Sequence, residues 1–177
     1  REQAINLLAG NYTDKSRKWC FYKADIHNDP FKFAVIDLED EYEISGFRMY
    51  DCKNLEPDDN VTHYQIAVST ELPDLDKITP QGDENTCWNT VVDKADGASR
   101  NTKEDVLDIP VRARYVKLTV PRTSEEMNAH TSRIYAFDVL GEKTTDGVTD
   151  IATEASGIAV PTVITAGEIV NFNVSNC

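Results

Sequence analysis

Short runs in which apolar and polar residues alternate recur from Phe33 to Gly141, and they constrain the fold more than any other feature. The alternation is clearest in Arg112–Val120 and Arg133–Gly141. Successive side chains of a strand point to opposite faces, so such runs predict strands with one buried face. No segment shows a sustained helical period, and turn residues separate the runs. The pattern therefore predicts an all-β sandwich.

The inward-facing side of each strand follows from the alternation. Pro110 is expected to end the strand before it, because proline cannot donate to a ladder. An acidic turn is expected to separate the first two strands. The predicted strands are Phe33–Leu38, Ile44–Tyr50, His63–Ser69, Trp88–Val92, Asp105–Ile109, Arg112–Val120 and Arg133–Gly141. The predicted core side chains on them are Phe47, Met49, Tyr64, Ile66, Val68, Val116, Leu118, Val120, Tyr135, Phe137 and Val139.

The net charge of the chain excludes some classes of binding partner. Lys plus Arg is 18 and Asp plus Glu is 31, which gives a net charge of −13. Such a surface repels nucleic-acid phosphates and anionic lipid headgroups, so neither is an expected partner. No apolar run is long enough to cross a bilayer, so membrane insertion is not expected. The chain begins with Arg1 rather than Met and is expected to be a piece of a longer protein.

The composition predicts three parts. Residues 1–142 are long enough to bury one sandwich core. Residues 143–158 have the composition of a linker. Residues 159–177 predict two strands around an Ala-Gly turn, as at the start of an immunoglobulin-like module, but about twenty residues cannot bury a core alone. That module is therefore expected to be truncated.

The cysteines, Cys20, Cys52, Cys87 and Cys177, have no zinc-type spacing. Four cysteines allow three full pairings, which sequence cannot distinguish. If a bridge forms, the interpretation favours Cys20 with Cys52. Half-buried free thiols are the alternative.

An ordered set of motifs resembles discoidin domains, also called coagulation factor V/VIII C-type domains. The set consists of Trp19, Phe33–Leu38, Ile44–Tyr50, Tyr64–Ser69, Trp88–Val92, Arg114–Leu118 and Ile134–Gly141. The resemblance covers roughly residues 6 to 142 and implies a galactose-binding-like jelly-roll sandwich. Bacterial members, similar to family-32 carbohydrate-binding modules, are non-catalytic appendages of secreted glycoside hydrolases.

The resemblance also implies a structural calcium site, for which Asp14 and Ser16 are the candidate ligands here. The family's glutamate near the start of the last strand is replaced by Ala136, with Asp138 two residues further on. A full shell of about six to eight oxygens is therefore harder to assemble. The alternative is a contact between a cation (Lys15, Arg17 or Lys18) and a carboxylate.

Rim aromatic residues and polar loop residues are the candidate ligand site. A flat aromatic ring packs against the C–H groups of a sugar, and carboxylates, amides and imidazoles bond its hydroxyls. Trp19 and Trp88 are instead predicted to pack in the core. The predicted ligand-binding residues are Phe21, Tyr22, Tyr50, Glu56, Asp58, Asn60, His63, Asn128 and His130. For each loop acid, a solvated turn is the alternative.

Catalysis is not expected. A glycosidase needs two carboxyl groups facing each other across a cleft, one kept protonated by burial, whereas these acids cluster in turns. The sequence predicts a non-catalytic carbohydrate-binding module of a secreted or cell-surface glycoside hydrolase, with a glycan ligand and neighbouring modules of the same chain as partners. The alternatives are an adhesion module that binds proteins or cell surfaces, and a structural spacer.

Overall fold

The computed structural model of the chain describes most of the predicted sandwich. The described residues are 4–8, 14, 16–21, 31–51, 61, 63–79, 82–94, 104–121, 132–144, 162–165 and 168–170. Only the backbone is described for residues 21, 31, 32, 51, 121, 132, 162–165 and 168–170. Within these ranges no helix has the length and apolar character needed to cross a bilayer.

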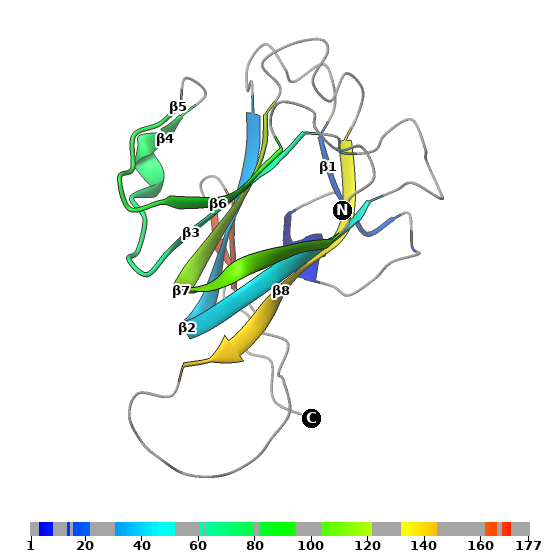
Figure 1. Cartoon of the computed structure of the whole chain (residues 1–177). Coiled ribbons are helices and arrows are strands. Elements are labelled where there is room, and N and C mark those ends of the chain that lie inside the picture. Colours follow the sequence, from blue (N-terminus) through cyan, green and yellow to red (C-terminus); the bar gives the residue numbers. More distant parts are fainter. Residues whose placement is uncertain are drawn as a thin grey trace.

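The described part of the chain consists almost entirely of antiparallel strands (Figure 1). The strands are β1 (Trp19–Phe21), β2 (Phe31–Asp51), β3 (Gln65–Ser69), β4 (Ile78–Thr79), β5 (Gly82–Asp83), β6 (Asn89–Asp93), β7 (Glu104–Pro121), β8 (Ser132–Lys143), β9 (Thr162–Thr165) and β10 (Glu168–Val170). Two short 3-10 helices, η1 (Ala4–Leu8) and η4 (Leu75–Lys77), accompany them. The strand order is β1-β8-β2-β7-β3-β6, and β4 pairs with β5 separately.

Two long strands build both layers of the sandwich. The first half of β2 pairs with the last part of β7, from Phe31 opposite Pro121 to Asp37 opposite Tyr115. The second half of β2 pairs with the first part of β7 and, on its other side, with β8. Of β7, only the last part pairs with β3, whose other edge pairs with β6. Figure 1 shows β2 and β7 turning together from one layer into the other, which confirms the galactose-binding-like sandwich.

The predicted break between the first two strands is wrong. β2 runs through the acidic segment, and its pairing with β7 shifts register between Asp37 and Tyr42. Glu39 has a φ of 68°, and its N–H donates to Asp37 Oδ1 over 2.8 Å. A side chain that bonds nearby backbone in this way supports a local turn without ending the strand.

The predicted strand end at Pro110 is also wrong. Val111 lies opposite Ile44 and Val106 opposite Gly46, so residues 107–110 have no partner in β2. Proline is tolerated at such an irregularity because no ladder hydrogen bond is lost there. β7 therefore continues through Pro110.

The predicted inward faces are mostly confirmed. The buried cluster includes Phe47, Met49, Tyr64, Ile66, Val68, Val116, Leu118, Val120, Phe137 and Val139. In β8, the predicted Tyr135 is fully buried, but Ile134, which was not predicted, belongs to the main cluster and Tyr135 does not. The reason is a register shift: Tyr50 lies opposite Ala136 and Asp51 opposite Ile134, which leaves Tyr135 as the extra residue.

The two tryptophans have different environments. Trp19 belongs to the main core, as predicted. Trp88 is half-buried and packs against the buried Val35 and Ile78, so it belongs to a second, smaller apolar cluster rather than to the main core. Val35 points away from Ala34 and Ile36, because neighbouring side chains of a strand face opposite sides. The Lys117 ammonium lies 4.7 Å from the centre of the Trp88 ring.

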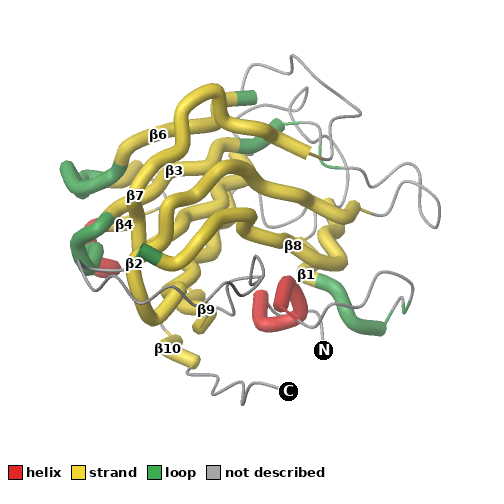
Figure 2. The backbone as a smooth tube through the Cα atoms, turned by 60° about the horizontal axis from the view of Figure 1, so that its bottom comes forward, coloured by secondary structure: helices red, strands yellow, loops and turns green. Residues whose placement is uncertain are grey.

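The last described strands form a hairpin that joins the sandwich. β9 pairs with β10 and also with Ala34–Asp37 of β2 (Figure 2). The division into residues 1–142, 143–158 and 159–177 stays a prediction. Cys87 carries a free, half-buried thiol. Cys52 and Cys177 lie outside the described residues, so the favoured bridge stays a prediction too.

Candidate functional site

The strand register gathers several chain connections at one end of the sandwich. Phe21 lies opposite Ser132, Asp51 opposite Ile134 and Phe31 opposite Pro121. The connections 22–30, 52–60 and 122–131 therefore begin and finish at neighbouring strand ends. We call this the loop end, and these strand ends carry the segments in which the ligand-binding residues were predicted.

Three predicted ligand residues are described at the loop end. Phe21 is the last residue of β1, and Tyr50 is the penultimate residue of β2. His63 is half-buried and precedes Gln65, which pairs with Thr119 near the end of β7. The other predicted residues, Tyr22, Glu56, Asp58, Asn60, Asn128 and His130, lie outside the described residues and stay predictions.

Four side chains form a polar row on the outward face beside this end. Arg48 lies opposite Glu104 on one side and opposite Asp138 on the other. Its Nε donates to Glu104 Oε2 over 3.3 Å. Hydrogen bonds with Tyr50 and Glu104 raise the pKa of Arg48 above its usual value. We call Glu104, Arg48, Tyr50 and Asp138 the Arg48 row.

Asp138 is the acid of the Arg48 row whose pKa is raised. Burial raises the pKa of its carboxyl above the usual value, although the charge of Arg48 and a hydrogen bond from the Tyr50 hydroxyl act in the opposite direction. Arginine only donates and a carboxylate only accepts, so the hydrogen bonds run from Arg48 to Tyr50 and from Tyr50 to Asp138. The phenol is thereby held in one orientation. A fixed, half-buried ring beside polar groups suits a hydroxyl-rich ligand.

A second cluster ties the ends of the connection 95–103. The Tyr64 hydroxyl donates to Asp105 Oδ2 over 2.7 Å, and the Lys94 ammonium contacts both Asp105 and the Tyr64 hydroxyl. Burial is the largest cause that raises the pKa of Tyr64, and the hydrogen bond to Asp105 and the negative charge of Asp105 raise it further. Because Tyr64 is adjacent to His63, this cluster also fixes the chain at a predicted ligand residue. Sequence reasoning placed Tyr64 in the core but missed its polar partners.

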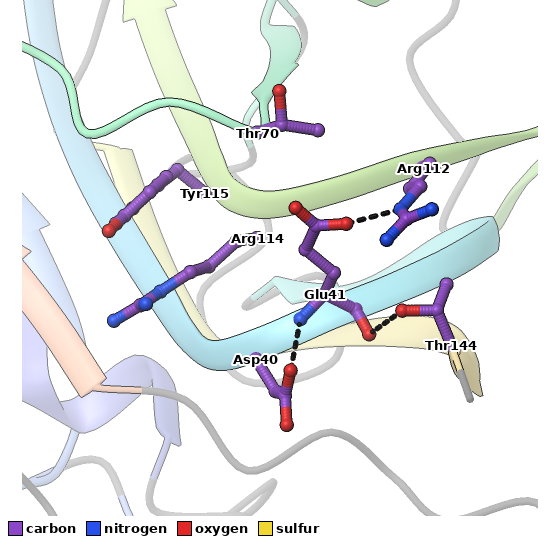
Figure 3. Close-up of a pocket in the computed structure, with 7 residues that line it drawn as sticks. All are labelled: Asp40, Glu41, Thr70, Arg112, Arg114, Tyr115 and Thr144. Atoms are coloured by element: carbon purple, nitrogen blue, oxygen red, sulfur yellow. Dashed lines mark hydrogen bonds and ion pairs between the residues drawn. The ribbon is translucent and has the colours of Figure 1, made fainter. Parts of the chain in front are cut away.

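The opposite end of the sandwich contains a cavity of about 260 Å³ where β2 and β7 bend. We call it the bend end. It is lined by Asp40, Glu41, Thr70, Arg112, Arg114, Tyr115 and Thr144 (Figure 3). Sequence reasoning missed this set, because its members come from two strands and two connections that only the folded topology brings together.

The charged groups at the bend end are matched with one another. Arg114 donates two hydrogen bonds to Asp37, of 2.7 and 2.9 Å, which raise the pKa of the guanidinium. Arg112 pairs with Glu41. A hydrogen bond from Lys143, followed by one from the Glu41 N–H, lowers the pKa of Asp40. Paired charges of this kind join the two strands at their bend. These arginine, lysine and acidic side chains neutralise one another, so they do not point to a charged ligand.

The calcium candidates are engaged with their own turn. Asp14 Oδ1 accepts hydrogen bonds from the Ser16 N–H (2.8 Å) and hydroxyl (2.7 Å). Arg17 Nε lies 4.0 Å from Asp14 Oδ2, which is the cation–carboxylate contact considered as the alternative. Within the described ranges, no group of three or more His, Cys, Asp or Glu side chains is placed to hold a metal. The described residues fit calcium poorly, and its binding stays a prediction.

The sequence profile of the F5/8 type C domain family matches residues 2–134. The chain belongs to the F5/8 type C (discoidin) family. None of the curated proteins matches the sequence.

Several solved structures share the fold. The family 32 carbohydrate-binding module from Streptococcus pneumoniae EndoD is 16% identical, with a TM-score of 0.53 over 80% of this chain and 86% of that one. The C-terminal domain of a chitobiase from Bacteroides fragilis is 17% identical, with a TM-score of 0.53 over 81% and 83%. A GH29 fucosidase from Ruminococcus gnavus is 15% identical, with a TM-score of 0.50 over 81% of this chain and 23% of that one.

Proposed function

We propose that this chain is a non-catalytic carbohydrate-binding module and that its ligand site is at the loop end. The observation that carries the proposal is the Arg48 row, in which the Tyr50 ring is held between Arg48 and Asp138 beside the loop connections. Membership of the F5/8 type C family supports it. So does the likeness to a solved family 32 carbohydrate-binding module.

The site would bind a sugar by combining a ring with polar contacts. Tyr50 supplies a face for the sugar C–H groups, while His63 and the predicted loop residues Glu56, Asp58, Asn60, Asn128 and His130 bond its hydroxyls. Phe21 and Tyr22 extend the aromatic surface. One aromatic and three or four polar contacts correspond to about −4 to −7 kcal/mol, or roughly millimolar to ten-micromolar dissociation constants.

Weak binding is sufficient for a module that is linked to an enzyme. A link keeps the neighbouring catalytic module close to its polymer and raises the effective concentration of substrate. We propose that the parent protein is a secreted or cell-surface glycoside hydrolase. Glycoside-degrading enzymes among the structural neighbours support this context.

The described acids favour binding over bond cleavage. A glycosidase needs a protonated carboxyl group opposite a second carboxyl group across a cleft. Asp138 has a raised pKa, but Tyr50 already donates to it and Arg48 lies beside it. Its carboxyl group is therefore committed to orienting Tyr50.

One observation favours the second candidate, adhesion to a protein. Val106 and Ile109 are 74% and 77% exposed on the first half of β7. Exposed apolar side chains suit a protein partner better than a sugar. Two such side chains expose little apolar surface, so glycan binding is the preferred function.

The test is a glycan array followed by calorimetric titration of the selected sugar. The wild-type chain should bind, and Tyr50→Ala should weaken binding while the fold is kept. Arg112→Ala, at the bend end, is the matched control and should bind like wild type. If no glycan binds, while Val106→Ser with Ile109→Ser abolishes retention on a cell surface, the adhesion function replaces the proposal.

A further inference from the structure

The first half of β2 has one edge that the main sandwich leaves unpaired. On one side, Ala34–Asp37 pairs with β7. On the other side, the pairing of β2 with β8 begins only at Tyr42. The backbone N–H and C=O groups of alternate residues in Ala34–Asp37, those that do not face β7, therefore point to an edge that β8 does not cover. Such an edge is a template for another strand.

We propose that Ala34–Asp37 is a strand-acceptor site whose occupant is the chain's own segment Thr162–Thr165. Thr162 lies opposite Asp37 and Thr165 opposite Ala34, in antiparallel register. β9 also lies against η1. The binding domain therefore extends to the C-terminal hairpin and does not end after β8.

The two ends of the connection 145–161 are held close together on β2, so β9 is already near its pairing site. The Thr144 N–H and hydroxyl donate to the Glu41 carbonyl over 3.0 and 2.8 Å. Thr162 then pairs with Asp37, four positions earlier on the same strand. Four residues of strand span about 13 Å. Seventeen residues can span up to about 55 Å, so the length of the connection 145–161 exceeds the separation that it has to cross.

A short connection makes weak pairing sufficient. Two segments joined by a flexible linker meet at an effective concentration of about millimolar. A segment of the same chain therefore has a large advantage over a strand from another molecule. The occupant is therefore intramolecular.

The sequence of the segment suits strand addition. All four residues from Thr162 to Thr165 are β-branched, which favours extended backbone. A two-stranded hairpin is marginal in water, and a third strand provides the stability that it lacks. β2 is that third strand, which explains how β9 and β10 can form without a core of their own.

Amide hydrogen exchange in the full chain tests the proposal. Successive amides of Ala34–Asp37 point alternately toward β7 and toward the other edge. In wild type, both sets should exchange slowly. In Ile164→Pro, the amides that face β9 should exchange at least a hundredfold faster, while those that face β7 keep their rates. Ile151→Pro, in the predicted linker, is the matched control and should change neither set.

Other outcomes overturn the proposal. It is wrong if the outward amides of wild type exchange as fast as solvent-exposed amides, or if their rates are the same in Ile164→Pro. Protection that changes with protein concentration would mean that a second copy supplies the strand. If Ile164→Pro also unfolds the β8 pairing, the milder Ile164→Gly takes its place with the same expectation. Glycan binding should be unchanged in every variant, so this test is independent of the proposed function.

Discussion

The loop end and the bend end both place arginines beside acids, but they use them differently. At the bend end, Arg114 binds Asp37 directly with two hydrogen bonds. At the loop end, an aromatic hydroxyl lies between Arg48 and Asp138. Direct charge pairs hold two strands together. An oriented ring instead presents a surface that a ligand can use.

The two ends also shift aspartate pKa values in opposite directions. Lys143 lowers the pKa of Asp40 at the bend end, whereas burial raises that of Asp138 at the loop end. Perturbed groups with a burial cause are more typical of functional sites, although structural networks produce them too. The contrast shows that the cause of a shift is more informative than the presence of a charge.

The largest expected effect is the loss of stability in Asp37→Ala. The variant loses both hydrogen bonds from Arg114 and the bond that supports Glu39. Hydrogen bonds to charged groups contribute about 1.5–3 kcal/mol, so the free energy of unfolding should fall by about 2–3 kcal/mol. Urea unfolding measures this. Glu43→Gln, an exposed acid on the same strand, should change it by less than about 0.5 kcal/mol. Equal losses in both variants would show that the Arg114 pair does not hold the bend.

Tyr50→Ala should affect binding more than stability. Removal of the ring should weaken glycan binding about tenfold or more, which corresponds to about 1.4 kcal/mol. Tyr50→Phe keeps the ring and should lose only the hydroxyl contribution, about 0.5–1.5 kcal/mol. Calorimetric titration measures both. The comparison of the two ends breaks down if Arg112→Ala weakens binding more than Tyr50→Ala does.

The opposite pKa shifts predict opposite effects of pH. The folded state holds the Asp138 proton more tightly than the unfolded state does, so the contribution of Asp138 to stability is present below pH 3.8 and is lost as the pH rises through its raised pKa. Asp138→Asn should therefore gain stability relative to wild type between pH 3 and pH 6. Asp40 has a lowered pKa, and its contribution is lost as the pH falls. NMR titration should find a pKa above 3.8 for Asp138 and a pKa below 3.8 for Asp40. The reverse order would contradict the proposed effects of burial on Asp138 and of Lys143 on Asp40.

The smallest effect is expected for Lys143→Ala. Its side chain and that of Asp40 are 59% and 51% exposed, and an exposed ion pair contributes about 0.2–1 kcal/mol. Thermal unfolding at low salt measures the loss, and high salt should reduce the difference from wild type. A salt-independent loss would mean that Lys143 stabilises the bend by packing.

Alternation predicted the fold well where one strand face is buried. Tyr64, Ile66 and Val68 point inward as expected, because their period matches the pleat. It was incomplete at irregularities: in β8, where the buried Tyr135 is an extra residue, the burial of Ile134 was not predicted. A turn and a bulge also have similar sequences, so the continuity of β2 through Glu39 was not predicted.

The site was less predictable than the fold. Tyr50 was predicted from its place at a strand end. Its partner Asp138 is 88 residues away in the sequence, and no local pattern connects them. The same is true of Arg114 and Asp37, which are 77 residues apart. Such pairs follow from register, which depends on the whole topology.

The most direct measurement is an NMR titration of the chain with the glycan that the array selects. The account predicts that resonances of Arg48, Tyr50 and His63 shift, that those of Arg112, Arg114 and Thr144 do not, and that the glycan stays intact. Shifts confined to the bend end, or release of free sugar by the purified chain, would contradict it.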